Sequence, residues 1–170
     1  MKFFLLSCLS FLSTIAYGQN ITIKDLISIT ECDRGTCFGT FFEGRGFHLK
    51  ERDTYKGLEL TYCTDPSIDL HATALNLYGG TVGVIILKPD KTAIMLLHDR
   101  FGFQENLLAE LHSLGFTWTK RVPFVDDEQA EQYNSSEFSD ISILVCSVVQ
   151  PYRTSRVTNY VVGVIRERSI

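Results

Sequence analysis

The sequence lacks the features that mark several large classes of protein. It has no surplus of basic residues, because 16 lysines and arginines stand against 20 aspartates and glutamates, for a net charge of −4. This balance argues against a nucleic-acid partner, which needs a basic surface. After the first residues, no segment reaches the run of about 18 apolar residues that is typical of a membrane-spanning helix.

Signature motifs of common enzymes are also missing. The chain contains no G-x-S-x-G, H-E-x-x-H, P-loop or dinucleotide-binding pattern. No pair of cysteines or histidines has the tight spacing of a zinc site, and the acidic residues do not follow the ordered pattern of a calcium loop. We therefore expect no metal and no cofactor, and the residues favour a binding protein over an enzyme.

The first eighteen residues have the composition of an export signal. One lysine precedes an apolar run from Phe3 to Ile15, and small residues follow it up to Gly18. This order predicts a secretory signal peptide over residues 1–18, cleaved after Gly18, and a single domain over residues 19–170. The expected location is the periplasm or the extracellular space.

Four cysteines follow the predicted cleavage site: Cys32, Cys37, Cys63 and Cys146. An even number of cysteines in an oxidising compartment indicates disulfide bonds. Cys32 and Cys37 are close in the sequence, so a bond between them is geometrically easy. Cys63 and Cys146 each lie in a strand-like segment, where they either form a second bond or remain buried thiols.

Three segments have the apolar spacing of helices: residues 22–31, 36–45 and 103–114. Thr22 and Asp25 have the spacing of a capping box at the start of the first. The second and third each run into a glycine followed by phenylalanine, at Gly46 and Gly115. A residue just past a helix end often needs positive φ, which glycine adopts without strain. Each Gly-Phe pair therefore predicts a helix end followed by the first inward residue of a strand.

Alternating apolar residues predict strands near residues 47–53, 58–64, 72–78, 81–88, 92–98, 116–122, 140–149 and 157–167. The polar segment 123–138 shows no periodicity and is interpreted as a long loop. The predicted fold is α+β, in two layers, with helices on one face of a mostly antiparallel sheet. The recurring helix-Gly-Phe-strand pattern suggests two degenerate repeats, over about residues 22–100 and 101–170. In that alignment Cys63 matches Cys146, and an insertion at 123–137 accounts for the offset.

The stretches "ITIKDLI", after the predicted signal peptide, and "ELHSLGFTWTK" resemble small exported proteins of Bacteroidota with no assigned activity. The resemblance covers mainly residues 19–50 and 103–121. It implies a two-layer α/β domain built from helix-plus-sheet units, an architecture that also looks like secreted inhibitors and envelope-assembly modules. Because the matched positions are helix ends and core residues, the resemblance carries over no catalytic residue.

The leading functional hypothesis is a non-catalytic exported protein that binds another macromolecule, as an inhibitor, an immunity factor or an envelope component. Aromatic and acidic residues are the candidate binding residues, since aromatic side chains often anchor interfaces. They are Tyr62, Tyr78, Trp118, Tyr133 and Tyr152, with Asp126, Asp127 and Glu128 in the acidic segment. We expect a protein partner.

Two other hypotheses remain open. A small hydrolase would use His98 with Asp99 or with Cys63, provided that these groups converge in a pocket. A binder of small apolar ligands would use a pocket between helices and sheet, lined by Phe38, Phe42 and Leu107.

Overall fold

The computed structural model describes residues 21–55, 57–70, 80–98, 103–124, 128–152 and 155–168. The predicted signal peptide and the strand expected at 72–78 lie outside these ranges. The described chain forms the helices α1 (Ile23–Ile29), α2 (Gly35–Glu43) and α3 (Phe103–Ser113). Its strands are β1 (His48–Asp53), β2 (Leu58–Cys63), β3 (Thr81–Leu87), β4 (Lys91–His98), β5 (Thr117–Pro123), β6 (Gln129–Asn134), β7 (Ile141–Tyr152) and β8 (Ser155–Glu167).

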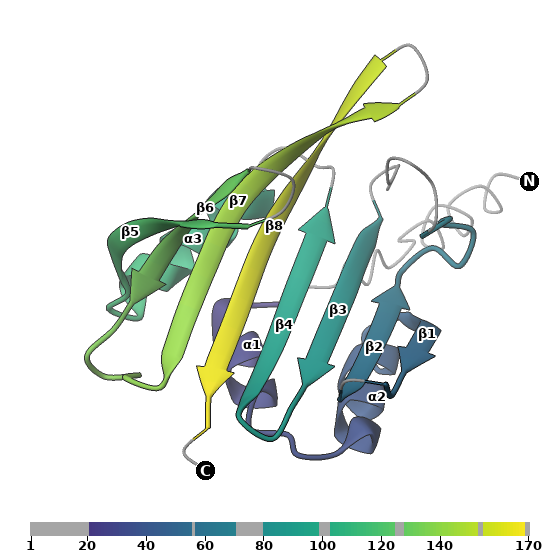
Figure 1. The fold of residues 1–170 in the computed structure, drawn as a ribbon, viewed down its shortest axis with the longest axis horizontal. Coiled ribbons are helices and arrows are strands. Elements are labelled where there is room, and N and C mark those ends of the chain that lie inside the picture. Colours follow the sequence, from purple (N-terminus) through teal and green to yellow (C-terminus); the bar gives the residue numbers. More distant parts are fainter. Residues whose placement is uncertain are drawn as a thin grey trace, which may run out of the picture.

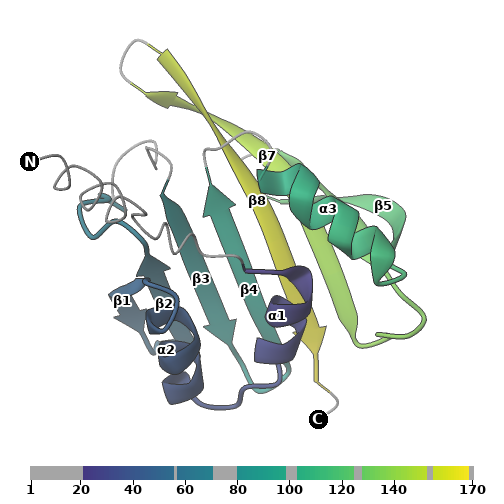
Figure 2. The same cartoon turned by 180° about the vertical axis from the view of Figure 1, so that it is seen from behind.

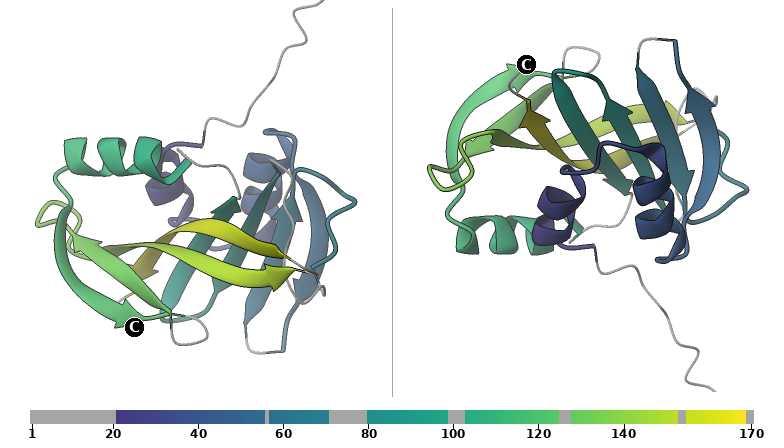
Figure 3. Two further views of the ribbon diagram at one scale, coloured as in Figure 1. Left: turned by 90° about the horizontal axis from the view of Figure 1, so that it is seen from above. Right: turned by 90° about the horizontal axis from the view of Figure 1, so that it is seen from below.

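The strands form one sheet in the order β1-β2-β3-β4-β8-β7-β6-β5 (Figure 1). Every neighbouring pair is antiparallel. All three helices lie on one face, where α1 and α3 contact β8 and α2 contacts β1 and β2 (Figure 2). Views along the strands show the same two layers (Figure 3). The antiparallel sheet with helices on one face is confirmed, but the sheet dominates, so the α+β class applies only loosely.

The two Gly-Phe helix ends have the same hydrogen bonds. At the end of α2, the amide of Gly46 donates to the carbonyl of Glu43 and that of Phe47 to the carbonyl of Phe42. At the end of α3, the amides of Gly115 and Phe116 donate to carbonyls at the same two spacings. Both glycines have positive φ, 80° and 76°. These are the bonds of a Schellman motif, so the predicted helix ends are confirmed.

The order of elements is the same in both halves of the described chain. A helix and four strands run from α2 to β4, and again from α3 to β8. β4 and β8 pair at the centre of the sheet, and each half continues outward in reverse chain order. The edge strands share a further detail, since β1 has a register shift at Leu49/Glu51 and β5 has one 69 residues later, at Trp118/Lys120.

Two expectations about the second half are wrong. Segment 123–138 is not one long loop, because β6 lies within it and pairs with β5 and β7. Ala130 and Tyr133 are both buried, but on opposite faces of the sheet, so the segment has no period-two pattern. Cys63 lies on β2 and Cys146 on β7, whereas β2 and β6 hold the same place in the two halves. The cysteines are therefore not equivalent positions.

The core between helices and sheet is organised around aromatic rings. The ring of Phe42 stacks on Tyr62 at 5.0 Å and meets Phe47 edge-on at 5.1 Å. Gly83 lies beneath it, and a Cβ atom there would come within 2.8 Å of the Phe42 ring. The absence of a side chain at Gly83 is therefore what lets the Phe42 ring lie against β3.

Helix α1 is held at both ends. The capping box of Thr22 and Asp25 is confirmed, and the carboxylate of Glu110 on α3 accepts from the amides of the first two helical residues at 2.8 and 3.2 Å. At the other end, Arg168 donates to the carbonyl of Cys32 at 2.6 Å. Negative charge at the start and positive charge at the end both complement the helix dipole. The predicted Cys32–Cys37 disulfide is present beside this end.

Candidate functional site

The face of the sheet opposite the helices is the open face of the molecule. Strand residues alternate between faces, so the register assigns every second residue to it. One cross-strand row runs along all eight strands, through Glu51, Thr61, Val84, Met95, Gly163, Leu144, Gln132 and Lys120. The row is polar at both edges of the sheet and apolar in the middle, as a contact surface with an apolar centre and a polar rim would be.

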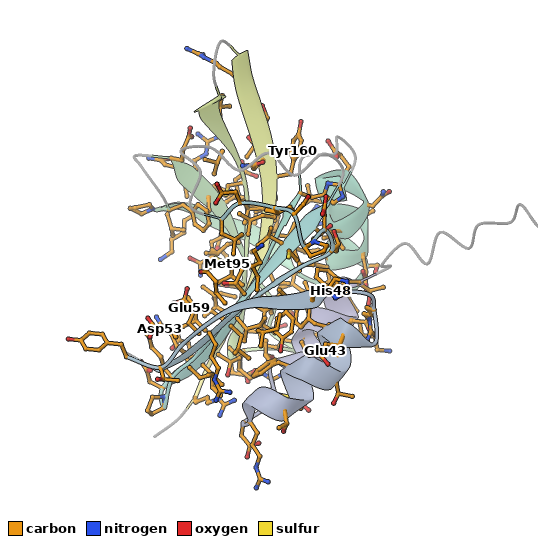
Figure 4. The ribbon with its side chains drawn as sticks, turned by 90° about the vertical axis from the view of Figure 1, so that its right-hand side faces the viewer. Glu43, His48, Asp53, Glu59, Met95 and Tyr160 are labelled. Carbon is orange, nitrogen blue, oxygen red and sulfur yellow. A yellow bond between two sulfur atoms is a disulfide. The ribbon has the colours of Figure 1, made fainter. Side chains whose placement is uncertain are left out.

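The middle of the open face carries half-buried apolar side chains. We call this set the open patch: Val84, Ile86, Met95, Leu144 and Ile165. Gly163 lies among them, and a Cβ atom there would be 3.4 Å from Cγ of Met95. Figure 4 shows Met95 on the side of the sheet away from α2. No helix covers this patch among the described elements, so its side chains remain partly exposed to solvent.

The row next to the open patch is covered. It runs through Cys63, Val82, Leu97, Val161 and Cys146. Ile68 and Leu70 pack over its first end, and Val122 and Phe124 pack against the other. This part of the face therefore stabilises the protein, while the apolar side chains of the open patch beside it stay half-buried.

Cys63 and Cys146 are free and buried. They lie four strand spacings apart, about 19 Å, whereas a disulfide needs Cα atoms within about 7 Å. A bond between them is therefore excluded, and the alternative of buried thiols is confirmed. Burial raises the pKa of Cys63 and raises that of Cys146 to about 11, with Glu128 adding to the latter shift. Both groups are protonated thiols near neutral pH, which makes them poor nucleophiles.

An acidic rim borders the open patch on the side of β1 and β2. It consists of Glu51, Asp53 and Glu59, all exposed. Asp53 and Glu59 are direct cross-strand partners and line a hollow of about 350 Å³ together with Ile86 and Lys88. Figure 4 shows both carboxylates on the same side of the sheet as Met95. The hollow thus joins negative charge to the apolar patch.

The opposite border, along β6 and β7, is polar but closed by internal bonds. The Gln132 amide donates to Ser142 at 3.0 Å and to Asn134 at 3.2 Å, and the Ser142 hydroxyl donates to Asn134 at 2.9 Å. These groups satisfy one another, whereas Lys120 beyond them is exposed. The two borders of the patch therefore differ in charge.

The predicted aromatic residues divide into buried and exposed. Tyr62 is 2% exposed and Tyr133 is 6% exposed, so the expectation that these rings lie at the surface is wrong. Both face the helices, where the Tyr62 ring stacks on Phe42 of α2 and the Tyr133 ring meets His112 of α3 edge-on. Trp118 is 54% exposed, but it is the cross-strand partner of Tyr133 and so lies on the helix side of an edge strand. These three predicted aromatic residues therefore lie on the helix side of the sheet and are not part of the open patch.

Several predicted binding residues fall outside the described ranges, namely Tyr78, Asp126 and Asp127, as does the side chain of Tyr152. Glu128 is described, and it lines a hollow of about 410 Å³ with Arg121, Glu131 and Cys146. Arg121 and Glu131 form an ion pair across it at 3.7 Å. This hollow is separate from the acidic rim on β1 and β2.

The two alternative sites are not assembled among the described residues. Leu97 and Cys63 share a row on the open face, so the adjacent residue, His98, points to the helix side, away from Cys63. Asp99 lies outside the described ranges. Phe38 and Phe42 are fully buried and Leu107 nearly so, and three rings surround Phe42 at 5.0 to 5.1 Å. The protein's own side chains therefore occupy the space expected for an apolar ligand.

Comparison with known proteins identifies no relative: no protein-family model, no curated protein and no solved structure matches the chain. Across the residues that the structure describes, no helix combines the length and the apolar character required to cross a membrane.

Proposed function

We propose that this protein is a non-catalytic exported binding module whose open face docks a second, different protein. The partner presents an apolar surface to the open patch and basic side chains to the acidic rim. The observation that carries this proposal is the half-exposed apolar patch beside a hollow lined by two carboxylates. An apolar centre with a charged border is the usual composition of a specific interface.

Two carboxylates of the acidic rim on β1 and β2 lower the stability of the folded protein. Asp53 and Glu59 lie directly opposite each other on neighbouring strands, and like charges in that position destabilise a sheet. Folding alone does not need two carboxylates here. A basic group of a partner, placed between them, would remove the repulsion on binding, which supports a role in recognition.

The edges of the sheet are poor docking sites, which favours the face. All six residues of β1 are exposed and four of them, from Lys50 to Asp53, are charged. β5 carries Lys120 and Arg121 and ends at Pro123. Charge, proline and register shifts on edge strands block the addition of a further strand. A partner is therefore expected to lie across the sheet rather than beside it.

Export is part of the same proposal. The disulfide between Cys32 and Cys37 is stable in an oxidising compartment and rare in a reducing one. An inhibitor, an immunity factor or an envelope component would each suit a binding module of this kind. The identity of the partner separates these roles.

Site-specific photocrosslinking tests the docking face. The crosslinker p-benzoylphenylalanine is placed at position 95, in the open patch, or at position 105 as a control. Glu105 is exposed on α3, on the opposite side of the molecule. We expect a discrete adduct with one other protein at position 95 in envelope extract of the source cells, and none of that adduct at position 105.

Charge reversal supplies the second arm of the experiment. In a chain that also carries Glu59→Lys, the adduct at position 95 should decrease, because the rim no longer attracts a basic partner. Added salt should decrease it in the unchanged chain for the same reason. Identical adducts from positions 95 and 105, or an adduct that Glu59→Lys leaves unchanged, would refute the proposal.

A further inference from the structure

A second concave site lies on the helix layer, between α2 and the strands β1 and β2. We call it the α2 groove; it has a volume of about 410 Å³ and is lined by Gly35, Gly39, Glu43, Arg52, Leu60 and Tyr62, among others. A Cβ atom at Gly39 would lie 3.5 Å from the hydroxyl of Tyr62. The absence of a side chain at Gly39 therefore leaves space above that hydroxyl in the groove.

Tyr62 places a hydroxyl group at the floor of the groove. The residue is 2% exposed, and its ring is stacked on Phe42. Among the described residues nothing hydrogen-bonds to its hydroxyl. Desolvation raises the pKa of this hydroxyl, Glu43 raises it further, and Arg52 lowers it, so both charges face the hydroxyl. The hydroxyl has no protein acceptor among the described residues, so a ligand carboxylate in the groove can accept its hydrogen bond.

The second half of the chain shows what the same pair of side chains binds. Tyr133 and Arg121 hold the places of Tyr62 and Arg52 in the register. There, Glu131 accepts a hydrogen bond from the hydroxyl of Tyr133 at 3.1 Å and forms an ion pair with Arg121 at 3.7 Å. A carboxylate of the protein itself thus occupies the space between tyrosine and arginine.

In the first half the place of Glu131 is taken by an apolar residue, Leu60. The cross-strand partner of Arg121 is Glu131, whereas the partner of Arg52 is Leu60. Within the described residues Arg52 forms no ion pair. The arginine and the tyrosine hydroxyl therefore present a carboxylate site that a ligand can fill.

The charge on α2 defines the other end of the ligand. Glu43 precedes Gly46 by three residues, as His112 precedes Gly115. The anionic side chain of Glu43 thus lines the α2 groove, whereas the second half has a histidine at the equivalent place. Its negative charge favours a cationic group on a ligand. We infer that the α2 groove binds a small zwitterion of the free amino acid class. Its carboxylate lies against Arg52 and Tyr62, and its ammonium group faces Glu43.

The binding test uses L-leucine as the probe, because Leu49 and Leu60 add apolar surface to the groove. Leucine is titrated into ¹⁵N-labelled protein, and the amide shifts of Gly35 and Gly39 are followed by NMR. N-acetyl-L-leucine lacks the cation and L-leucinamide lacks the anion. Saturable shifts with leucine, at least tenfold weaker with either derivative, are expected. No saturable shift with leucine, or equal binding of either derivative, overturns the inference.

Matched arginine variants assign the binding to this groove. Arg52→Gln removes the cation from the α2 groove and should abolish the shifts. Arg121→Gln makes the same change in the second half, where Glu131 already fills the site, and should leave them intact. Tyr62→Phe keeps the buried ring and removes only the hydroxyl, so it tests the site in a folded protein and should weaken binding. Equal binding by the Arg52→Gln and Arg121→Gln variants, or unchanged binding by Tyr62→Phe, contradicts the inference.

Discussion

At the end of α3, the substitution Gly115→Ala should introduce backbone strain without a steric clash. Gly115 has φ of 76°, a conformation that costs a residue with a side chain roughly 1–2 kcal/mol. A Cβ atom at this position would lie 3.8 Å from its nearest neighbour, the Ser135 hydroxyl. This is an ordinary contact, so no clash adds to the strain. Gly115→Ala should therefore lower the free energy of unfolding by about 1–2 kcal/mol.

A second glycine in the same protein provides the control. Gly39 lies inside α2, and its added Cβ atom would be 3.5 Å from the Tyr62 hydroxyl, which is again an ordinary contact. In a helix interior alanine is more favourable than glycine by about 1 kcal/mol. Gly39→Ala should therefore stabilise the protein, so the same substitution should have opposite signs at the two positions.

Urea denaturation and thermal unfolding of the two variants measure this difference. For a domain of this size, 1 kcal/mol corresponds to about 2–4 °C in Tm. Gly115→Asn should fall between wild type and Gly115→Ala, because asparagine tolerates positive φ better than alanine. An unchanged stability of Gly115→Ala, or equal losses for both alanine variants, would show that the helix end does not depend on the glycine.

Three further predictions concern the open face and the α2 groove. Glu59→Lys replaces repulsion with Asp53 by attraction and should raise the unfolding free energy by about 0.2–1 kcal/mol in urea denaturation; a loss of stability would contradict the register. Tyr62→Phe should leave stability unchanged or raised, whereas Tyr133→Phe, which loses a bond to Glu131, should lower it by about 1 kcal/mol; equal effects would refute the difference between the halves. The Cys146 thiol has its pKa raised from 9.0 to about 11 by burial, so its contribution to stability is complete below pH 9 and is lost as the pH rises to about 11. A Cys146→Ala variant should lack that part of the alkaline loss in urea titrations, and identical pH profiles would contradict it.

Local features were predictable because short-range physics controls them. The capping box at Thr22 and the glycine ends at Gly46 and Gly115 each depend on a few adjacent residues. Most strands were also predictable, because apolar and polar residues alternate along a strand whose two faces have different surroundings. β6 was missed because its buried residues, Ala130 and Tyr133, point to opposite faces.

The candidate site was less predictable than the fold. Aromatic composition pointed to Tyr62 and Tyr133, which are buried. The acidic rim arises because β1 and β2 pair in a register that places Asp53 opposite Glu59. A pairing register is a long-range property, and a slip of β1 by one residue would send Asp53 to the other face, away from Glu59.

By itself the sequence determined where helices begin and end, which segments alternate and which enzyme motifs are absent. Only the tertiary structure decided that β4 meets β8 at the centre, that the described helices leave the open patch uncovered, and that Glu131 takes the place that Leu60 holds in the first half. The physical reason is the range of the interactions. Caps and turns form between neighbours in the chain, whereas burial and charge pairing depend on residues that only folding brings together.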